Sequence, residues 1–346
     1  MPDQLKKPDI DPTPIFEHFR GSYGSQLLTA AVSHLNVFGC LATGAMLFDD
    51  LRDAIELQQR PAVVLITALR AMGFVEKDDD GLLQLTPVAR EHLVPGSTFD
   101  VGNYVGLAAS SPGVLEMVER LRTNKPASGD GGTAFIYRDG VASAMESEQL
   151  ARHFTLALAG RAKNVAPHLA DAAPMNGNEV LLDVAGGTGI YAIAFLREHP
   201  GKKAIIMDRP EVLKVAAEYA QQYEVADRLK LLEGDMFQDA LPVADVVLLS
   251  NVLHDWDVPE NRQLIRRCAD ALPSGDRLLI HDVYLNDELD GPLPIALYSA
   301  ALFTLTEGRA YSAAEYRQWL EESHFSVQPG PVSTLVHCGV LTGVKG

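Results

Sequence analysis

The second half of the chain alternates between short apolar runs and amphipathic stretches. Runs rich in Val, Ile and Leu predict strands at 179–184, 203–208, 229–233, 244–250 and 276–282. Apolar residues at helical spacing predict helices at 189–198, 210–222, 259–272 and 312–323. The last segments, 325–332 and 335–344, predict two strands joined by a turn. We therefore expect an α/β fold with a doubly wound, mostly parallel sheet and an antiparallel C-terminal hairpin at its edge.

The first hundred residues follow a helical pattern. Small and apolar residues are interleaved over residues 15–45, which predicts helix. Asp49 or Asp50 can cap a short helix that continues through Glu56, because a carboxylate accepts hydrogen bonds from the free N–H groups of a first turn. This part of the chain is therefore expected to be mainly α.

A second helix and a hairpin complete this region. Apolar residues on one face predict a helix over 61–72, with Pro61 in its first turn. Two short strands follow on either side of a polar turn at 78–81. This order is the winged-helix pattern, which often binds DNA, but the hairpin tip carries three aspartates whose charges repel phosphate. We expect the domain to serve in packing or dimerisation instead.

Changes of pattern divide the chain into three parts. Residues 1–100 form the predicted winged-helix dimerisation domain, and residues 101–175 form a helical linker. Residues 176–346 form the predicted cofactor-binding domain. Within the linker, helices are expected on either side of a glycine-rich loop; the ranges are 112–123, 146–172 and, for the loop, 128–132.

Composition limits the partners that the chain can have. It contains 346 residues, of which 47% are hydrophobic, enough for a sizeable core. Its formal net charge is −17, and an acidic surface repels nucleic acid and anionic membranes. The apolar run 295–305 is too short to span a bilayer, and the N-terminus lacks the apolar core of a signal peptide. Three scattered cysteines argue against a disulfide framework or a zinc site, so we expect a cytoplasmic protein.

A glycine-rich loop follows the first strand of the predicted sheet. Residues 183–189 read Asp-Val-Ala-Gly-Gly-Thr-Gly, with Gly186, Gly187 and Gly189 at the strand-to-helix turn. Such glycines let the backbone approach a ligand, and the N–H groups at the helix start favour a negative group. Asp208 follows about 20 residues later and can bind ribose hydroxyls. This loop fits a dinucleotide fingerprint as well as it fits S-adenosylmethionine.

Two further features favour S-adenosylmethionine. Asp183 precedes the loop, and a carboxylate there can hold an ammonium group, which S-adenosylmethionine has and NAD lacks. Asp235 follows the third strand and can accept a hydrogen bond from an adenine amino group. Met236 and Phe237 are soft apolar side chains that can enclose a ring. Since turn acids and core residues share these patterns, an NAD-dependent oxidoreductase stays an alternative.

A histidine follows the fourth strand, at the sheet edge where doubly wound folds bind ligands. His254 can accept a proton from a substrate hydroxyl while the hydroxyl oxygen is methylated. Asp282, at the end of the next strand, can hold the other ring nitrogen, and Glu307 is a weaker candidate. Asp255 and Asp257 are interpreted as helix caps or, with His254, as metal ligands, although no spacing requires a metal.

Five motifs carry a resemblance over nearly the whole chain: Asp183-Val-Ala-Gly-Gly-Thr-Gly, Asp208-Arg-Pro, Gly234-Asp-Met-Phe, His254-Asp-Trp and Gly308-Arg-Ala-Tyr-Ser. In these the chain resembles the plant-type and bacterial S-adenosylmethionine-dependent O-methyltransferases of the caffeate, hydroxyneurosporene and anthracycline group. The resemblance implies methyl transfer to a hydroxyl of a small aromatic or polyketide-like acceptor. It also implies a homodimer with intertwined N-terminal domains and a reaction that needs no metal.

The resemblance also implies roles for single residues. His254 would be the base, and Asp282 the acid that orients it. The expected cofactor residues are Asp183, Gly186, Gly187, Gly189, Asp208, Asp235, Met236 and Ser250. The expected acceptor pocket takes residues from the linker and from the second half of the chain: Phe154, Leu158, Asp255, Phe303 and Glu307.

Two positions depart from the family pattern. Ser250 stands where a lysine is often found four residues before the histidine, so part of the expected grip on the cofactor's carboxylate is missing. Ala310 stands where plant enzymes have a second orienting glutamate, which leaves Asp282 alone. Some relatives use the fold for hydroxylation or decarboxylation, so a non-methylating relative that keeps S-adenosylmethionine is an alternative. A winged-helix regulator that senses a small molecule is another.

Overall fold

The computed structural model describes residues 5–125, 148–176 and 179–346, and the chain divides into two compact units. Unit 1 comprises residues 1–16, 135–284 and 311–346. Unit 2 comprises residues 17–134 and 285–310. The units therefore differ from the three predicted parts of the chain. Residues 101–125 group with the N-terminal helices, and residues 285–310 also belong to unit 2. The predicted loop at 128–132 lies outside the described residues.

Unit 1 is built on one twisted sheet. Its strands are β3 (Val180–Val184), β4 (Lys203–Asp208), β5 (Leu229–Glu233), β6 (Val246–Ser250), β7 (Arg277–Leu285), β8 (Tyr311–Ser312), β9 (Phe325–Val327), β10 (Val332–Ser333) and β11 (Cys338–Lys345). The order β5-β4-β3-β6-β7 is parallel throughout, and β11 pairs with β7 in the antiparallel direction. The chain moves outward from β3 to β5 and then returns to place β6 beside β3. The topological switch point, where such sheets bind ligands, therefore lies between β3 and β6.

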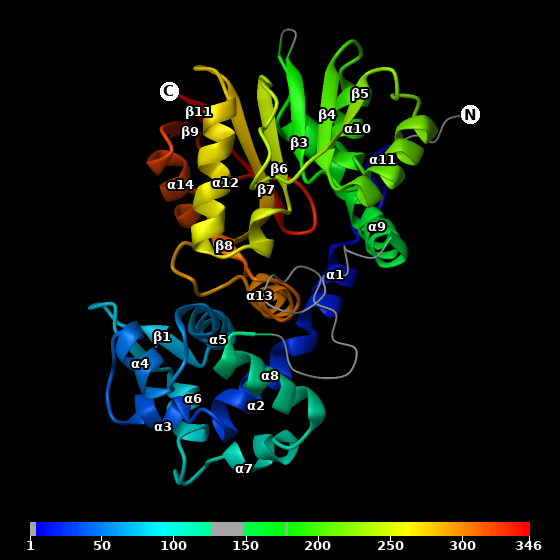
Figure 1. The fold of residues 1–346 in the computed structure, drawn as a ribbon. Helices are drawn as coiled ribbons and strands as arrows, with labels where there is room; N and C mark the ends of the chain where they lie inside the picture. The colour runs from blue at the N-terminus through cyan, green and yellow to red at the C-terminus, as the bar shows by residue number, and fades with distance from the viewer. Residues whose placement is uncertain (1–4, 126–147, 177–178) are drawn as a thin grey trace. The chain divides into compact units, whose positions relative to one another are not determined.

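Helices cover both faces of this sheet (Figure 1). The helices α9, α10 and α11 lie on one face, and α12 and α14 on the other. Their bounds are α9 (Glu148–Ala172), α10 (Ile190–Glu198), α11 (Pro210–Gln222), α12 (Val258–Ala271) and α14 (Ala313–Glu322). The central strands are buried on both faces, which explains why β3 and β6 are continuous apolar runs. The predicted doubly wound sheet is confirmed.

The predicted antiparallel C-terminal strands are confirmed, but their number and bounds differ from the prediction. Three strands replace the expected two, and β9 and β10 each pair with β11. Pro329 and Pro331 lack the N–H group that a ladder requires, so no continuous strand runs over 325–332. Val336 and His337 have positive φ values of 58° and 59°, and β11 begins only after them.

Unit 2 is mainly helical. Its elements are α1 (Thr13–Arg20), which begins in unit 1, the 3-10 helices η1 (Gly21–Tyr23) and η2 (Gly106–Ala108), α2 (Gly24–Ser33), α3 (Val37–Ala42), α4 (Phe48–Ala54), α5 (Gln59–Ala71), β1 (Val75–Lys77), β2 (Leu83–Leu85), α6 (Pro87–His92), α7 (Gly102–Val105), α8 (Pro112–Thr123) and α13 (Leu293–Leu305). The helix predicted over 15–45 is interrupted at Asn36, whose left-handed φ of 51° turns the chain.

The predicted order of helix, helix and hairpin is present as α4, α5 and the antiparallel pair β1–β2. The predicted cap of the first helix is wrong. Leu47 occupies the N-cap of α4, and Asp49 and Asp50 lie inside the first turn. Their charges still favour the helix start through its dipole, although neither caps it.

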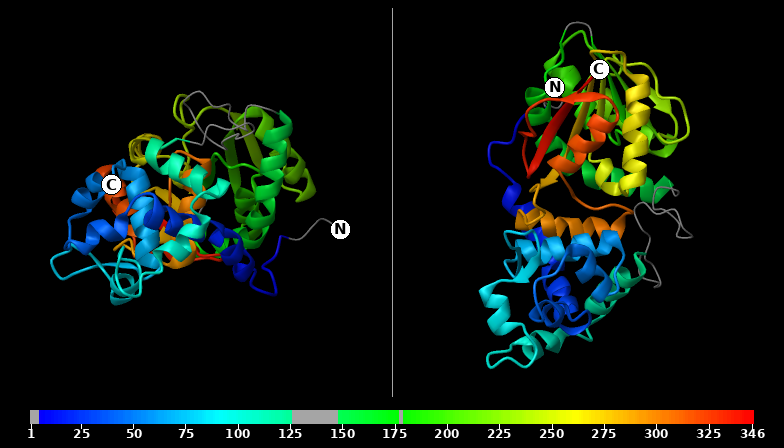
Figure 2. Two further views of the ribbon diagram at one scale, coloured as in Figure 1. Left: turned by 90° about the horizontal axis from the view of Figure 1, so that it is seen from below. Right: turned by 90° about the vertical axis from the view of Figure 1, so that its left-hand side faces the viewer.

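Residues 285–310 belong to unit 2 because α13 lies along α5 (Figure 2). Ala300 and Phe303 of α13 share one buried apolar cluster with residues of α5. The buried Arg60 donates hydrogen bonds to the carbonyls of Thr306, at 3.0 Å, and Gly308, at 3.3 Å. Its guanidinium also lies 4.8 Å from the centre of the Phe303 ring. Within the described parts of both units, no helix is long and apolar enough to cross a membrane.

Candidate active site

The glycine loop leaves β3 at the switch point of the sheet. Gly187 and Gly189 have positive φ values of 59° and 72°, which favour glycine. Gly189 also lies against Ile206, whose Cδ1 would stand 2.3 Å from an added Cβ. At Gly187, no atom of the described chain lies within 4 Å of an added Cβ. Packing thus requires Gly189, while Gly187 leaves open space in which a ligand can approach the backbone.

Asp208 ends β4 beside this loop. Its Oδ2 accepts a hydrogen bond from the Gly187 N–H at 2.9 Å, and its Oδ1 accepts one from the Arg209 N–H at 2.7 Å. Burial raises the pKa of Asp208, and these two backbone N–H groups offset part of that effect. The carboxylate is held rigidly against the loop and keeps lone pairs that can accept hydrogen bonds from ribose hydroxyls.

Asp183 is fully buried near the end of β3. Its carboxylate faces the loop, because Oδ2 would lie 2.8 Å from a Cβ added at Gly186. Neither carboxylate oxygen has a hydrogen-bond partner of ordinary geometry in the described part of the chain, although the Ala192 N–H lies near enough to lower the carboxyl pKa in part. Burial, followed by the charge of Asp208, raises the pKa of Asp183 to about 8. A buried carboxylate without a partner is unfavourable, so this position fits the ammonium group of a bound amino acid.

Asp235 follows β5 and is exposed. Its Oδ1 accepts a hydrogen bond from the Phe237 N–H at 2.7 Å, which forms a tight turn. Met236 is partly buried beside this turn. Phe237 packs edge-on against Trp256, with 4.8 Å between ring centres. The turn can therefore offer one carboxylate and one thioether to a flat ring, whereas Phe237 is engaged with the core.

A polar cluster follows β6 on the other side of the switch point. Asn251, with a positive φ of 57°, accepts a hydrogen bond from Arg161 of α9. Its Nδ2 donates to Ser250 Oγ at 3.0 Å and to the Tyr191 hydroxyl at 3.3 Å. Tyr191 belongs to the first turn of α10, directly after the glycine loop. The fold thus brings a guanidinium to the end of β6, beside the loop.

Sequence reasoning missed Arg161. It lies in the middle of α9, where its spacing resembles that of any helical arginine. Only the packing of α9 against the sheet brings it to Asn251. The left-handed φ of Asn251 marks this place in the structure, but the sequence carries no signal for it.

His254 lies in the 3-10 helix η4 (Leu253–Asp255) after β6 and is buried. Its Nδ1 is 2.6 Å from Asp282 Oδ1. Asp282 is held in turn, since it accepts hydrogen bonds from the Val283 N–H at 2.8 Å and from the Tyr316 hydroxyl at 3.2 Å. On the other side of the ring, Nε2 lies 3.7 Å from Asp255 Oδ1. The structure thus brings together the histidine and the acid that the sequence pairs.

Charges around His254 determine its protonation. Burial lowers the pKa of His254, but the charges of Asp282 and Asp255 and the hydrogen bond with Asp282 outweigh burial and raise the pKa above its usual 6.5. Burial alone would raise the pKa of Asp282, but the charge and hydrogen bond of His254 lower it. Burial raises the pKa of Asp255 to about 6. The charge of Arg161 lowers the pKa of all three groups, so Arg161 acts on the same site.

The residues expected in an acceptor pocket are divided between the units. Phe154 and Leu158 lie on α9 in unit 1, and the Leu158 side chain is 52% exposed. Phe303 and Glu307 belong to unit 2. Phe303 is 4% exposed and contributes to the core of that unit.

The other acids near His254 have distinct positions. Asp257 caps α12, as interpreted from the sequence, by accepting a hydrogen bond from the Val258 N–H at 2.8 Å. Asp255 instead faces the histidine. Among the residues that the structure describes, no three His, Cys, Asp or Glu side chains are grouped so that they could hold a metal ion.

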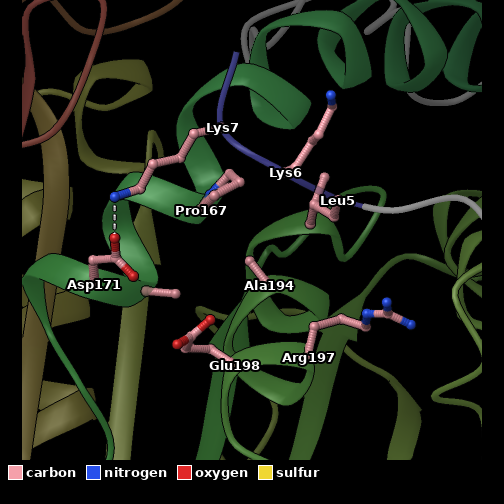
Figure 3. A pocket seen from close by; sticks show the side chains of 9 residues that line it. Leu5, Lys6, Lys7, Pro167, Asp171, Ala194, Arg197 and Glu198 are labelled. Carbon is pink, nitrogen blue, oxygen red and sulfur yellow. Dashed lines mark ion pairs between the residues drawn. The ribbon is translucent and has the colours of Figure 1, made fainter. Parts of the chain in front are cut away.

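A cavity of about 390 Å³ lies elsewhere in unit 1 (Figure 3). It is lined by Leu5, Lys6, Lys7, Pro167, Ala170, Asp171, Ala194, Arg197 and Glu198. Lys7 forms an ion pair with Asp171 at its edge. Arg197 and Glu198 end α10, so this cavity lies at the opposite end of that helix from the glycine loop. It is separate from the site around His254.

Comparisons with known proteins identify the family of the chain. A family model described as an O-methyltransferase domain matches residues 126–326. The chain is 33% identical over 338 residues to 3-hydroxy-5-methyl-1-naphthoate 3-O-methyltransferase of Streptomyces sahachiroi, covering 96% of this chain and 95% of that protein. It is 30% identical over 308 residues to the tetracenomycin polyketide synthesis 8-O-methyl transferase TcmO of Streptomyces glaucescens, covering 88% of each.

A solved structure matches over the full length. It is an O-methyltransferase family 2 protein from Planctomyces limnophilus DSM 3776, in complex with apigenin, that is 46% identical to this chain. The TM-score is 0.91, and the match covers 100% of both chains. Together with the glycine loop, the unpaired Asp183 and the His254–Asp282 pair, these matches place the chain in the family of S-adenosylmethionine-dependent O-methyltransferases.

Proposed function

We propose that the enzyme methylates a hydroxyl on an aromatic, polyketide-type acceptor and that His254 removes the hydroxyl proton. The observation that carries this proposal is the buried His254–Asp282 pair, at 2.6 Å, at the carboxyl end of β6. β6 lies beside β3, which contains the unpaired Asp183 and leads into the open glycine backbone. A base and a cofactor site are thus adjacent at one switch point.

Four features of unit 1 suit the four parts of S-adenosylmethionine. We assign Asp208 to the ribose hydroxyls, and Asp235 with Met236 to the adenine. Asp183 would receive the ammonium group, either directly or through water. Arg161, with Ser250 and Asn251, would receive the carboxylate in place of the lysine that the family often has, since a guanidinium binds a carboxylate through two hydrogen bonds. When bound, S-adenosylmethionine supplies a methyl group on a positively charged sulfur.

The proton step is assigned to His254. Asp282 holds Nδ1 and so fixes the ring plane, which leaves Nε2 to accept the proton of an acceptor hydroxyl. Asp282 also stabilises the imidazolium that results, because its own pKa is lowered and it stays ionised. Asp255, whose Oδ1 lies 3.7 Å from Nε2, can accept a hydrogen bond from the substrate next to the oxygen that is methylated. Removing this proton and aligning the oxygen with the methyl group requires no metal ion.

The relatives support the class of acceptor. The Streptomyces sahachiroi enzyme is named for a hydroxynaphthoate, and the Planctomyces limnophilus structure contains apigenin. Both molecules carry hydroxyl groups on aromatic rings. The exposed apolar side chains of α9, among them Leu158, offer a surface against which such rings can pack.

An assay tests this proposal directly. The purified chain is incubated with S-adenosylmethionine and either a 3-hydroxynaphthoate or apigenin, and S-adenosylhomocysteine is measured. We expect His254→Ala to lower turnover by about 10²- to 10⁴-fold while cofactor affinity is kept. His324→Asn, at an exposed histidine, is the matched control, and EDTA should leave the rate unchanged. An unchanged rate in His254→Ala would remove His254 from the mechanism.

We further propose that unit 2 is a dimerisation domain. Tyr104 and Leu107 are each 78% exposed, and Phe99 is 60% exposed in the same segment. Apolar side chains that are this exposed are typical of an interface. The double variant Tyr104→Glu and Leu107→Glu should be monomeric by light scattering while the wild type is dimeric. A monomeric wild type would contradict this part of the proposal.

A further inference from the structure

His281, on β7 next to Asp282, is a fully buried histidine that the proposed proton step does not use. Both of its ring nitrogens meet hydroxyl groups. Nδ1 lies 2.8 Å from Ser250 Oγ, and Nε2 lies 3.1 Å from Thr334 Oγ1. The Tyr191 ring packs edge-on against it, with 5.2 Å between ring centres. These contacts fix the orientation of the imidazole from three sides.

The His281 ring is neutral. Burial and then the charge of Arg161 lower its pKa to about 3. A neutral imidazole has one donor and one acceptor nitrogen, and a hydroxyl group can complement either. His281 is therefore suited to bridge Thr334 and Ser250 permanently and unsuited to exchange protons near neutral pH.

The bridge continues from Ser250 to Arg161. Ser250 Oγ accepts a hydrogen bond from Asn251 Nδ2 at 3.0 Å, and Asn251 Oδ1 accepts one from Arg161. The backbone N–H of Asn251 also donates to the His281 carbonyl at 2.8 Å. Asn251 is thus hydrogen-bonded to the His281 backbone directly and linked to the His281 ring through Ser250. The orientation in which the Asn251 amide oxygen accepts the hydrogen bond from Arg161 therefore depends on the His281 ring.

We propose that His281 is a positioning residue that acts through Ser250 and Asn251 to hold Arg161 in place for the cofactor's carboxylate. This inference rests on the proposed function, which assigns that carboxylate to Arg161. It gives a physical reason why Ser250 can stand where the family often has a lysine. The serine links His281 to Asn251 in a partly buried chain of hydrogen bonds, and the positive charge comes from Arg161 on α9.

Two ligands of the same pocket separate this role from a general structural one. S-adenosylhomocysteine has the amino acid carboxylate and ammonium, whereas 5′-methylthioadenosine has the same adenosine and thioether without them. Calorimetric titration of the full chain with each ligand gives two dissociation constants. We divide the constant for 5′-methylthioadenosine by that for S-adenosylhomocysteine. This ratio measures how much the amino acid end adds to binding, and partial unfolding of a variant does not change it.

Two substitutions of His281 are matched. An asparagine side chain can place its amide near the former Nδ1 and keep the link to Ser250, whereas a glutamine places it near Nε2, toward Thr334. We expect His281→Gln to weaken S-adenosylhomocysteine about 3- to 10-fold, the effect of one hydrogen bond, with 5′-methylthioadenosine unchanged. His281→Asn should keep the ratio within about twofold of wild type. Arg161→Met should lower the ratio more than either substitution of His281 does.

Other outcomes overturn the inference. If His281→Gln keeps the wild-type ratio, or weakens both ligands equally, His281 does not position the carboxylate site. Ser250→Ala, a small change at a partly exposed residue, provides the same test if His281→Gln does not fold, and an unchanged ratio there has the same meaning. A wild-type chain that binds neither ligand would instead contradict the proposed function itself.

Discussion

The substitution Asp282→Asn tests the electrostatic account of the base. Asp282 is 1% exposed, and its carboxylate contacts His254 Nδ1 at 2.6 Å. Asparagine keeps the shape but removes the charge. A hydrogen bond to a charged group contributes about 1.5–3 kcal/mol, so we expect kcat at neutral pH to fall about 10- to 150-fold. This is a smaller loss than the removal of His254, because the imidazole is retained.

The pH profile gives a second, independent reading of the same variant. The base acts when it is unprotonated, and the pKa of His254 is raised above 6.5, so wild-type kcat/KM should rise with pH through a midpoint above 6.5. Asp282 is the largest of the causes that raise this pKa, whereas burial and Arg161 lower it. In Asp282→Asn the midpoint should therefore move to lower pH. Asp257→Asn, at the cap of α12, is the matched control.

The result that would refute this reasoning is a midpoint that stays in place in Asp282→Asn. It would mean that the observed titration belongs to another group, such as Asp255 or the acceptor itself. An unshifted midpoint together with an unchanged kcat would remove Asp282 from the account.

Two further predictions concern the cofactor loop. The pKa of Asp183 is raised from 3.8 to about 8, so the ligand-free protein should lose stability as pH rises through that range. In denaturant titrations at pH 8, Asp183→Asn should be more stable than wild type by several kcal/mol, at about 1.4 kcal/mol per pKa unit, and a less stable variant would contradict this. The same variant should bind S-adenosylhomocysteine more weakly. Asp208→Asn should weaken the binding of S-adenosylhomocysteine and of 5′-methylthioadenosine alike, by about 10- to 150-fold in calorimetry, because both contain the ribose. A loss of affinity for only one of the two ligands would show that Asp208 does not bind the ribose.

The sheet of unit 1 could be predicted well because its strands are buried on both faces. Continuous apolar runs such as β3 and β6 have one stable environment, and the βα alternation then fixes the topology. The errors occurred where single backbone features decide the structure. Pro329 and Pro331 ended a strand that the apolar pattern extended, and the left-handed Asn36 interrupted a helix.

The candidate site was predictable where function depends on strand ends. Asp183, Asp208 and His254 each lie near or just after the end of a strand, and parallel strands bring such ends to one edge. Asp282 was expected at a strand end as well, but it lies inside β7, which continues to Leu285. Arg161 was not predictable in this way. It reaches the site from the side of α9, across the sheet face, and helix packing of that kind leaves no mark in a single sequence.

The central claim is that an acceptor oxygen receives a methyl group and is otherwise unchanged. It is tested most directly with S-adenosylmethionine that carries a deuterated methyl group and a hydroxynaphthoate whose hydroxyl oxygen is labelled with ¹⁸O. The account predicts a product that contains the deuterated methyl group and retains the labelled oxygen, with one S-adenosylhomocysteine formed for each product. A product without the deuterated methyl group, or with the methyl group on carbon, would contradict it.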